Sequence, residues 1–201
     1  LELGGRALLL NARHPAAFVA GTAMLTVAKI VENMEIGHNV LHGQWDWMRD
    51  PDIHSTTWEW DFVTPSRAWQ NTHNDLHHRW TNVVGKDRDV GYNVLRMDES
   101  EPWRPRHLLN PVINAGLAPI FEWGIALYDL ELDRVHTGEK SREELMTDLR
   151  SVGVKAARQF AKDYVATPAV AEVLTGSGKA ALVGTLLANG LRNTVSYTHL
   201  T

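Results

Sequence analysis

Five of the ten histidines lie in two short clusters, and these clusters constrain the fold more than any other feature of the chain. His38 and His42 are four residues apart, as are His73 and His77, and His78 follows directly. Residues four apart lie on the same face of an α-helix, so each pair predicts a helix that carries two imidazoles side by side. His78 is rotated by about 100° from His77, so it can close a site from the side.

The residue types in these clusters indicate a metal site. Imidazole is a good ligand for iron, zinc, copper and nickel. The chain contains no cysteine, so thiolate ligands and disulfides are excluded. The sequence therefore predicts one shared site that holds more than one metal ion, with these ligands: His38, His42, His73, His77 and His78.

Three other interpretations use the same residues. The clusters could be two surface helices that are rich in histidine, or they could form a mononuclear zinc site. Glu35 and His38 also fit the Glu-x-x-His motif of soluble ferritin-like di-iron proteins, with a faint second copy at Asp133 and His136. The doubled histidine at 77–78 has no place in that motif.

The pattern HxxxH followed by HxxxHH resembles the histidine boxes of the integral-membrane fatty acid desaturases and their hydroxylase relatives. The resemblance covers about Ala16 to Asp133 and rests on three stretches: Glu35–Trp47, Trp58–Asp61 and Thr72–Asn82. It implies an all-α membrane protein whose metal site lies at the membrane–water boundary, facing the cytoplasm from the bacterial cytoplasmic membrane.

The same resemblance implies a reaction. Two iron ions would support the O₂-dependent desaturation of a fatty acyl chain linked to CoA, a lipid or a carrier protein. A ferredoxin-like carrier would supply the electrons. The alternatives are a lipid or alkane hydroxylase or ketolase of the same superfamily, or a non-catalytic metal-binding membrane protein.

The family pattern is incomplete in this chain. A third box, HxxHH, is expected downstream, but the only histidines after His78 are His107, His136 and His199. We therefore expect residues 1–201 to be a partial desaturase domain that is inactive alone, with residues 195–201 as a non-native tail. The isolated histidines, including His14 and His54, are expected to have ordinary structural roles.

Carboxylates near the boxes are expected to orient the ligands. A metal-bound imidazole usually donates its other N–H to a carboxylate or a carbonyl. Glu35 lies one turn before His38, and Asp75 lies between His73 and His77, so both are predicted to accept such bonds. The sequence assigns no further catalytic residue.

Composition leaves the membrane question open. The formal charge is −4 and the pI is about 6.2, which gives no sign of nucleic-acid binding. The mean hydropathy of −0.26 is low for a membrane protein, and no run of 18 uncharged apolar residues exists. Buried core helices of a soluble protein would explain the apolar segments equally well. Three apolar segments approach the length that a transmembrane helix needs. The first is Ala16–Ala28, whose helical pattern continues to His38. The second is Leu108–Leu130, which could span the membrane or re-enter it, and the third is Ala180–Leu191.

Helix signals recur along the chain, and no strand-rich region is visible. We expect helices over Ala16–Gln44, over Ser66–Asn82 with Ser66 as the N-cap, and over Ser141–Val165. Ser141 and Glu144 predict a capping box. Residues 49–65 are expected to form a loop, and Gly85–Gly91 a polar turn.

Overall fold

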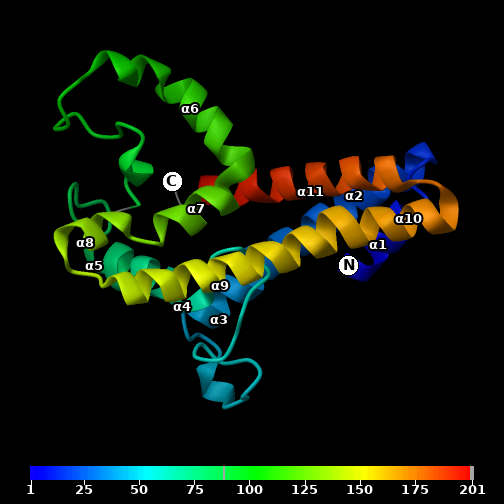
Figure 1. The fold of residues 1–201 in the computed structure, drawn as a ribbon, viewed down its shortest axis with the longest axis horizontal. Helices are drawn as coiled ribbons and strands as arrows, with labels where there is room; N and C mark the ends of the chain where they lie inside the picture. The colour runs from blue at the N-terminus through cyan, green and yellow to red at the C-terminus, as the bar shows by residue number, and fades with distance from the viewer. Residues whose placement is uncertain (88, 200–201) are drawn as a thin grey trace.

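The structure is a computed structural model, and it describes residues 1–87 and 89–199. All regular secondary structure in this part of the chain is helical, which confirms the all-α prediction (Figure 1). The α-helices are α1 (Glu2–Leu9), α2 (Pro15–Ile30), α3 (His38–Leu41), α4 (Ser66–Trp69), α5 (His78–Trp80), α6 (Asn110–Leu117), α7 (Phe121–Tyr128), α8 (Leu132–Thr137), α9 (Arg142–Phe160), α10 (Thr167–Thr175) and α11 (Gly178–His199).

Three π-helical segments join some of these helices into longer ones. They are Val31–Gly37 between α2 and α3, Gln70–His77 between α4 and α5, and Ala161–Ala166 between α9 and α10. Short π-helical turns are rare and occur often at functional sites. Two of them adjoin or contain the histidine clusters.

The first histidine pair lies at the end of a continuous helix, Pro15–Leu41. Pro15 occupies the first turn, where its missing N–H costs nothing. The helix ends before Gln44, the end expected from the sequence, because Gly43 adopts a left-handed conformation with φ of 73°. Within the described residues, this helix is the one long and apolar enough to cross a membrane, a test that buried core helices also pass.

The second cluster lies on a helix that runs from Ser66 to Trp80, two residues short of the expected end. Ser66 is not its N-cap. Instead, the carboxylate of Glu59 accepts hydrogen bonds from the Ser66 backbone N–H at 3.0 Å and from its hydroxyl at 3.3 Å. A carboxylate from outside the helix thus satisfies the exposed first turn, as a side-chain cap would.

A long helical hairpin forms the rest of the bundle. Ser141 and Glu144 make the expected capping box, with bonds of 3.1 Å and 2.7 Å. The helix then continues through the π-helical segment into α10, ten residues beyond the expected end at Val165. Gly176, with φ of 67°, reverses the chain into α11. The tail proposed at residues 195–201 falls partly on α11 and partly on Leu200 and Thr201, which lie outside the described residues.

Helices α1, α2, α10 and α11 lie side by side at one end of the molecule (Figure 1). Their shared core contains small and aliphatic side chains: Leu9, Ala12, Leu25, Ala171, Ala181 and Ala188. Helices α1 and α2 meet closely at Gly5, where an added Cβ would lie 2.8 Å from the Leu25 backbone nitrogen. This packing holds the histidine-bearing helix in a fixed place.

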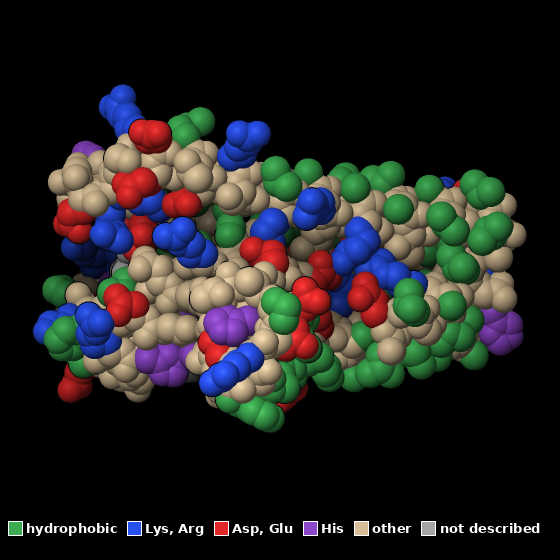
Figure 2. Space-filling view, turned by 90° about the horizontal axis from the view of Figure 1, so that it is seen from below, with side chains coloured by type: hydrophobic (Ala, Val, Ile, Leu, Met, Phe, Trp, Pro, Cys, Tyr) green, Lys and Arg blue, Asp and Glu red, His purple; other side chains and the backbone are tan. Residues whose placement is uncertain are grey.

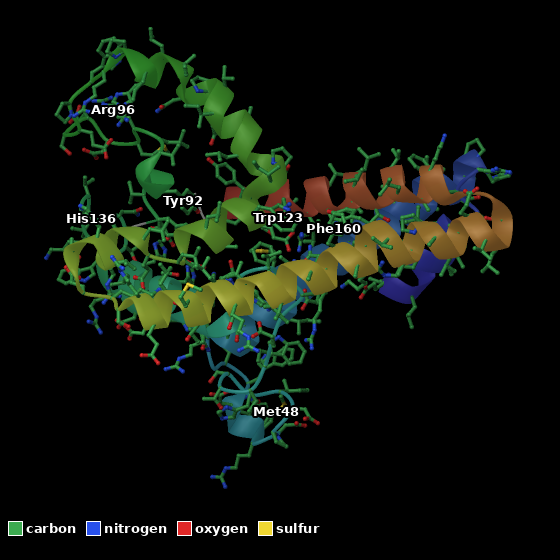
Figure 3. All side chains as sticks on the ribbon, viewed as in Figure 1. Met48, Tyr92, Arg96, Trp123, His136 and Phe160 are labelled. Atoms are coloured by element: carbon green, nitrogen blue, oxygen red, sulfur yellow. The ribbon has the colours of Figure 1, made fainter. Side chains whose placement is uncertain are left out.

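The segment Leu108–Leu130 is divided in the structure. It consists of the end of a 3₁₀ turn (Pro105–Leu109), α6, a second 3₁₀ turn (Ala118–Ile120) and α7. Pro119 lies at this second turn, and proline cannot donate the hydrogen bond that a continuing helix needs. The loop expected at residues 49–65 contains no helix, and Met48 lies on the same projection away from the bundle (Figure 3).

Candidate metal centre

All five predicted histidines come together where the two box-bearing helices meet. The ring centroids of His38 and His42 are 4.5 Å apart, and those of His42 and His78 are 4.8 Å apart. His73 lies among them, at 5.4 Å from His38, 5.3 Å from His42, 5.0 Å from His77 and 4.9 Å from His78. Two helices that are separated by a loop in the sequence thus contribute their histidines to one imidazole cluster.

Side chains of the second helix fasten it to the end of the first. The amides of Gln70 and Asn74 both donate to the backbone carbonyl of Leu41, at 3.0 Å and 2.9 Å. The Trp69 ring stacks on His73 with centroids 4.4 Å apart and planes inclined by 21°. These contacts fix both the spacing of the helices and the plane of the His73 ring.

The electrostatics of the cluster favour neutral imidazoles. Burial, together with the neighbouring His73 and His78, lowers the pKa of His42 to about 4. The pKa of His78 is also lowered, by burial and by its neighbours His73 and His77. Neutral imidazole presents a free lone pair, so His42 and His78 can bind a metal at neutral pH.

Two groups of donor atoms are close enough to hold a metal ion. One comprises His38, His42 and His73; the other comprises His73, His77 and Asp89. Within each group, the donor atoms all lie within 4.8 Å of one another. The Nε2 atoms of His38 and His42 are only 3.0 Å apart, which suits two ligands that point at a common ion.

The carboxylates that face the histidines are not those expected from the sequence. His77 Nδ1 lies 3.0 Å from both carboxylate oxygens of Asp87, and His73 Nδ1 lies 3.4 Å from Asp89. Asp75 instead forms an exposed ion pair with Arg79 at 2.6 Å, and Glu35 is exposed. The alternating Asp-x-Asp in the Gly85–Gly91 turn was the only sequence signal for Asp87 and Asp89.

His54, His107 and His136 lie outside the cluster. The His54 ring bonds to the Thr56 hydroxyl at 2.9 Å, and His107 accepts the backbone N–H of Arg104 at 3.0 Å. His136 is exposed on α8 (Figure 3).

An apolar cavity lies among α6, α7, α11 and Tyr92. Its volume is about 250 Å³, and its lining includes Tyr92, Leu117, Phe121, Ile125, Tyr128 and Tyr197. Figure 3 shows Tyr92 beside α7. A much smaller cavity of about 20 Å³ touches His38 and shares Phe121 and Ile125 with the larger one. Apolar space therefore begins next to a candidate ligand.

Comparison with known proteins gives one kind of match. No family model and no solved structure matches the chain. The chain is 48% identical over 194 residues to proteins named NADPH-dependent stearoyl-CoA 9-desaturase from two Mycobacterium tuberculosis strains, CDC 1551 and H37Rv. The aligned region is 96% of this chain but 45% of each relative, so the chain spans less than half their length. This similarity supports a desaturase family for the chain.

Proposed function

We propose that this chain carries part of an O₂-dependent fatty acyl desaturase with a di-iron centre held by His38, His42, His73, His77 and His78. The observation that carries the proposal is the convergence of all five imidazoles from two helices. The relatives' shared name, stearoyl-CoA 9-desaturase, favours fatty acyl desaturation as the reaction.

The donor set fits iron. Neutral imidazoles bind iron while they leave coordination positions open, and five imidazoles brought together from two helices favour two neighbouring ions. The low pKa of His42 supports this fit, because a protonated ring could not be a ligand. When bound, iron with O₂ supplies the oxidant that an unactivated C–H bond requires and that no side chain provides.

The remaining steps belong to residues of the chain. The helix contacts at Leu41, Gln70 and Asn74 hold the two sets of imidazoles at a fixed separation. Phe121 and Ile125 line both apolar cavities, so they would guide an alkyl chain toward His38 and exclude water from it. Such positioning accounts for much of the rate gain when a reacting bond must meet a fixed oxidant.

Exposed apolar side chains favour a membrane location. Large hydrophobic residues are exposed on four neighbouring helices, namely Leu3 on α1, Val19 and Val27 on α2, Val170 and Val173 on α10, and Val183, Leu186 and Leu187 on α11. Figure 2 shows hydrophobic side chains gathered over one half of the molecule, and most charged side chains over the other. We infer that the apolar half lies in the bilayer and that the imidazole cluster lies at its cytoplasmic boundary.

The relatives' name also bears on the partners. It favours a fatty acyl-CoA as substrate and a reductase-type, NADPH-linked electron supply rather than a ferredoxin specifically. A hydroxylase would act on the same kind of chain, but it would leave an alcohol. Product analysis by mass spectrometry separates the two reactions.

The test uses the full-length protein purified from membranes. We expect about two iron ions per chain, and conversion of stearoyl-CoA to an unsaturated product only when O₂ and reductant are present. Single alanine variants of the five histidines should lose iron and activity, whereas His136→Ala should retain both, since His136 is exposed on α8. Box variants that keep full iron content would contradict the proposal.

A further inference from the structure

We propose that Asp87 and Asp89 are positioning residues, which fix the ring orientation and the tautomer of His77 and His73 so that Nε2 of each faces the metal. This inference rests on the proposed metal centre. It concerns two carboxylates that lie ten and sixteen residues from the rings they face, across a reversal of the chain.

The backbone of the turn brings these carboxylates back to the histidines. Asn82 and Gly85 both adopt left-handed conformations, with φ of 61° and 80°. The backbone N–H groups of Lys86 and Asp87 then donate to the carbonyl of Val83 at 3.0 Å and 2.8 Å. A non-glycine residue with positive φ is uncommon, so the conformation of Asn82 marks a turn that the surrounding structure maintains.

Asp87 is held rigidly in place. Its side chain is fully buried, at 0% exposure, and it accepts the backbone N–H of Asn82 at 2.7 Å and that of Asp89 at 3.0 Å. Both carboxylate oxygens also lie 3.0 Å from His77 Nδ1. A carboxylate fixed by two backbone donors can in turn fix the imidazole that it contacts.

Asp89 has the same relation to the next ring. Its side chain is 8% exposed and lies 3.4 Å from Nδ1 of His73 and 3.6 Å from Nδ1 of His77. The His73 and His77 rings are stacked, with centroids 5.0 Å apart and planes inclined by 15°. The two carboxylates therefore lie along the Nδ1 edges of two parallel rings.

This arrangement selects one tautomer. An ionised carboxylate is only an acceptor, so the imidazole nitrogen that faces it must carry the proton. A neutral ring protonated at Nδ1 keeps its lone pair at Nε2, where a metal can bind. Hydrogen bonding to a carboxylate also makes the ring a stronger donor to the metal.

Asp75 provides a control on the helix that carries His73 and His77. It is 51% exposed and paired with Arg79.

The test measures metal affinity rather than activity. In the full-length protein, Asp87→Asn should weaken iron binding by about 10- to 100-fold in competition with a chelator. The asparagine amide can donate to Nδ1, which would move the ring proton to Nε2 and block the ligand. Asp89→Asn should have a smaller effect, because its contact is longer, and Asp75→Asn should have none. The visible spectrum of the Co²⁺-substituted protein should change for the first two variants only.

A double-mutant comparison separates positioning from general stability. Because Asp87 acts through His77, adding Asp87→Asn to His77→Ala should cause no further loss of iron affinity. An additional loss in the double variant, or unchanged affinity and spectrum in Asp87→Asn, would overturn the inference. If the unaltered protein itself binds no iron, the proposed function fails instead, and the two failures are distinguishable.

Discussion

Two polar clusters lie along the helix Pro15–Leu41, and they differ in how their groups are satisfied. The first, which we term the buried ion cluster, comprises Arg6, Lys29, Asp163 and Asn189. Asp163 is 0% exposed and lies 2.9 Å from Lys29 Nζ, 2.7 Å from Arg6 and 3.1 Å from the Asn189 amide. Three helical elements thus provide donors to one carboxylate, and opposite charges offset one another within the protein.

The imidazole cluster has the opposite character. Like groups face one another there, with Nε2 atoms of His38 and His42 3.0 Å apart and with the pKa of His42 lowered by burial and by its neighbours. The charges of the buried ion cluster are therefore balanced within the protein, whereas under the proposed function the imidazole cluster would be completed by a bound cation.

The largest effect should come from breaking the buried ion cluster. Asp163→Ala leaves Lys29 buried at 3% exposure without its closest carboxylate, so we expect a loss of about 3–5 kcal/mol in the free energy of unfolding. Denaturation in detergent measures it. Asp148→Ala, which removes a partly exposed partner of Lys140, should cost at most about 1 kcal/mol. If both variants lose a similar amount of unfolding free energy, the buried ion pair is no more important for stability than the surface pair.

Iron should act on the imidazole cluster alone. At a free concentration 100 times its dissociation constant, a ligand specific for the folded state adds about 2.7 kcal/mol to the free energy of unfolding. We expect such a gain in the full-length protein, reversed by a chelator and absent in His73→Ala. In Asp163→Ala, iron should add the same amount to the free energy of unfolding, although that free energy is lower without iron than in the unaltered protein. An iron-dependent gain that survives in His73→Ala would contradict this separation of the two clusters.

A third carboxylate near the imidazole cluster makes stability depend on pH. Burial is the main cause that raises the pKa of Asp129 to about 7, although Thr72 donates a hydrogen bond to it at 2.8 Å. In the unfolded chain an aspartate titrates near 3.9, so the folded state binds more protons between about pH 4 and 7. Stability is therefore lost as the pH rises through this range.

Replacing Asp129 should remove this loss. Relative to the unaltered protein, Asp129→Asn should gain on the order of 4 kcal/mol between pH 4 and pH 8, because the pKa lies about three units above its unfolded value. Unfolding curves at several pH values measure the gain, and Asp52→Asn, at an exposed loop position, serves as the control. If the difference in the free energy of unfolding between Asp129→Asn and the unaltered protein does not change with pH, Asp129 does not titrate in this range.

The smallest effect is expected at the surface pair beside the imidazole cluster. Arg79→Ala removes an exposed partner of Asp75, which should cost about 0.3–0.5 kcal/mol and leave iron binding unchanged. Denaturant unfolding together with iron analysis tests both parts. Loss of iron in this variant would mean that Asp75 contributes to the metal centre after all.

The features that sequence could predict are local ones. The Ser141 and Glu144 capping box involves residues three apart, and it was confirmed. The histidine pairs were visible because helical periodicity fixes which residues share a face. The prediction of one shared site came from the residue types of the two clusters, and the resemblance strengthened it, since the spacing within each helix does not say that the helices meet.

The features that sequence could not predict depend on distant or unusual backbone contacts. Glu59 satisfies the helix start at Ser66 from outside the helix, and Lys29 meets Asp163 across 134 residues. Asp87 faces His77 across a turn in which Asn82 adopts a left-handed conformation, which most asparagines do not. Such a turn has the same amino-acid composition as an ordinary solvated loop, so composition does not reveal its contacts.

The π-helical segment Val31–Gly37 acts as a phase shift along the helix. Lys29 and His38 are nine residues apart, and in a regular α-helix at about 100° per residue they would point to opposite sides. A π-helical turn accommodates about one extra residue, which rotates the residues after it by roughly 100° relative to those before it. The π-helical turn therefore reduces the angle between Lys29 and His38 from about 180° to about 80°, so that the two clusters lie on neighbouring sides of one helix. Shortening this segment by one residue would rotate the histidine pair by roughly 100° relative to Lys29, while leaving the side chains of both clusters unchanged.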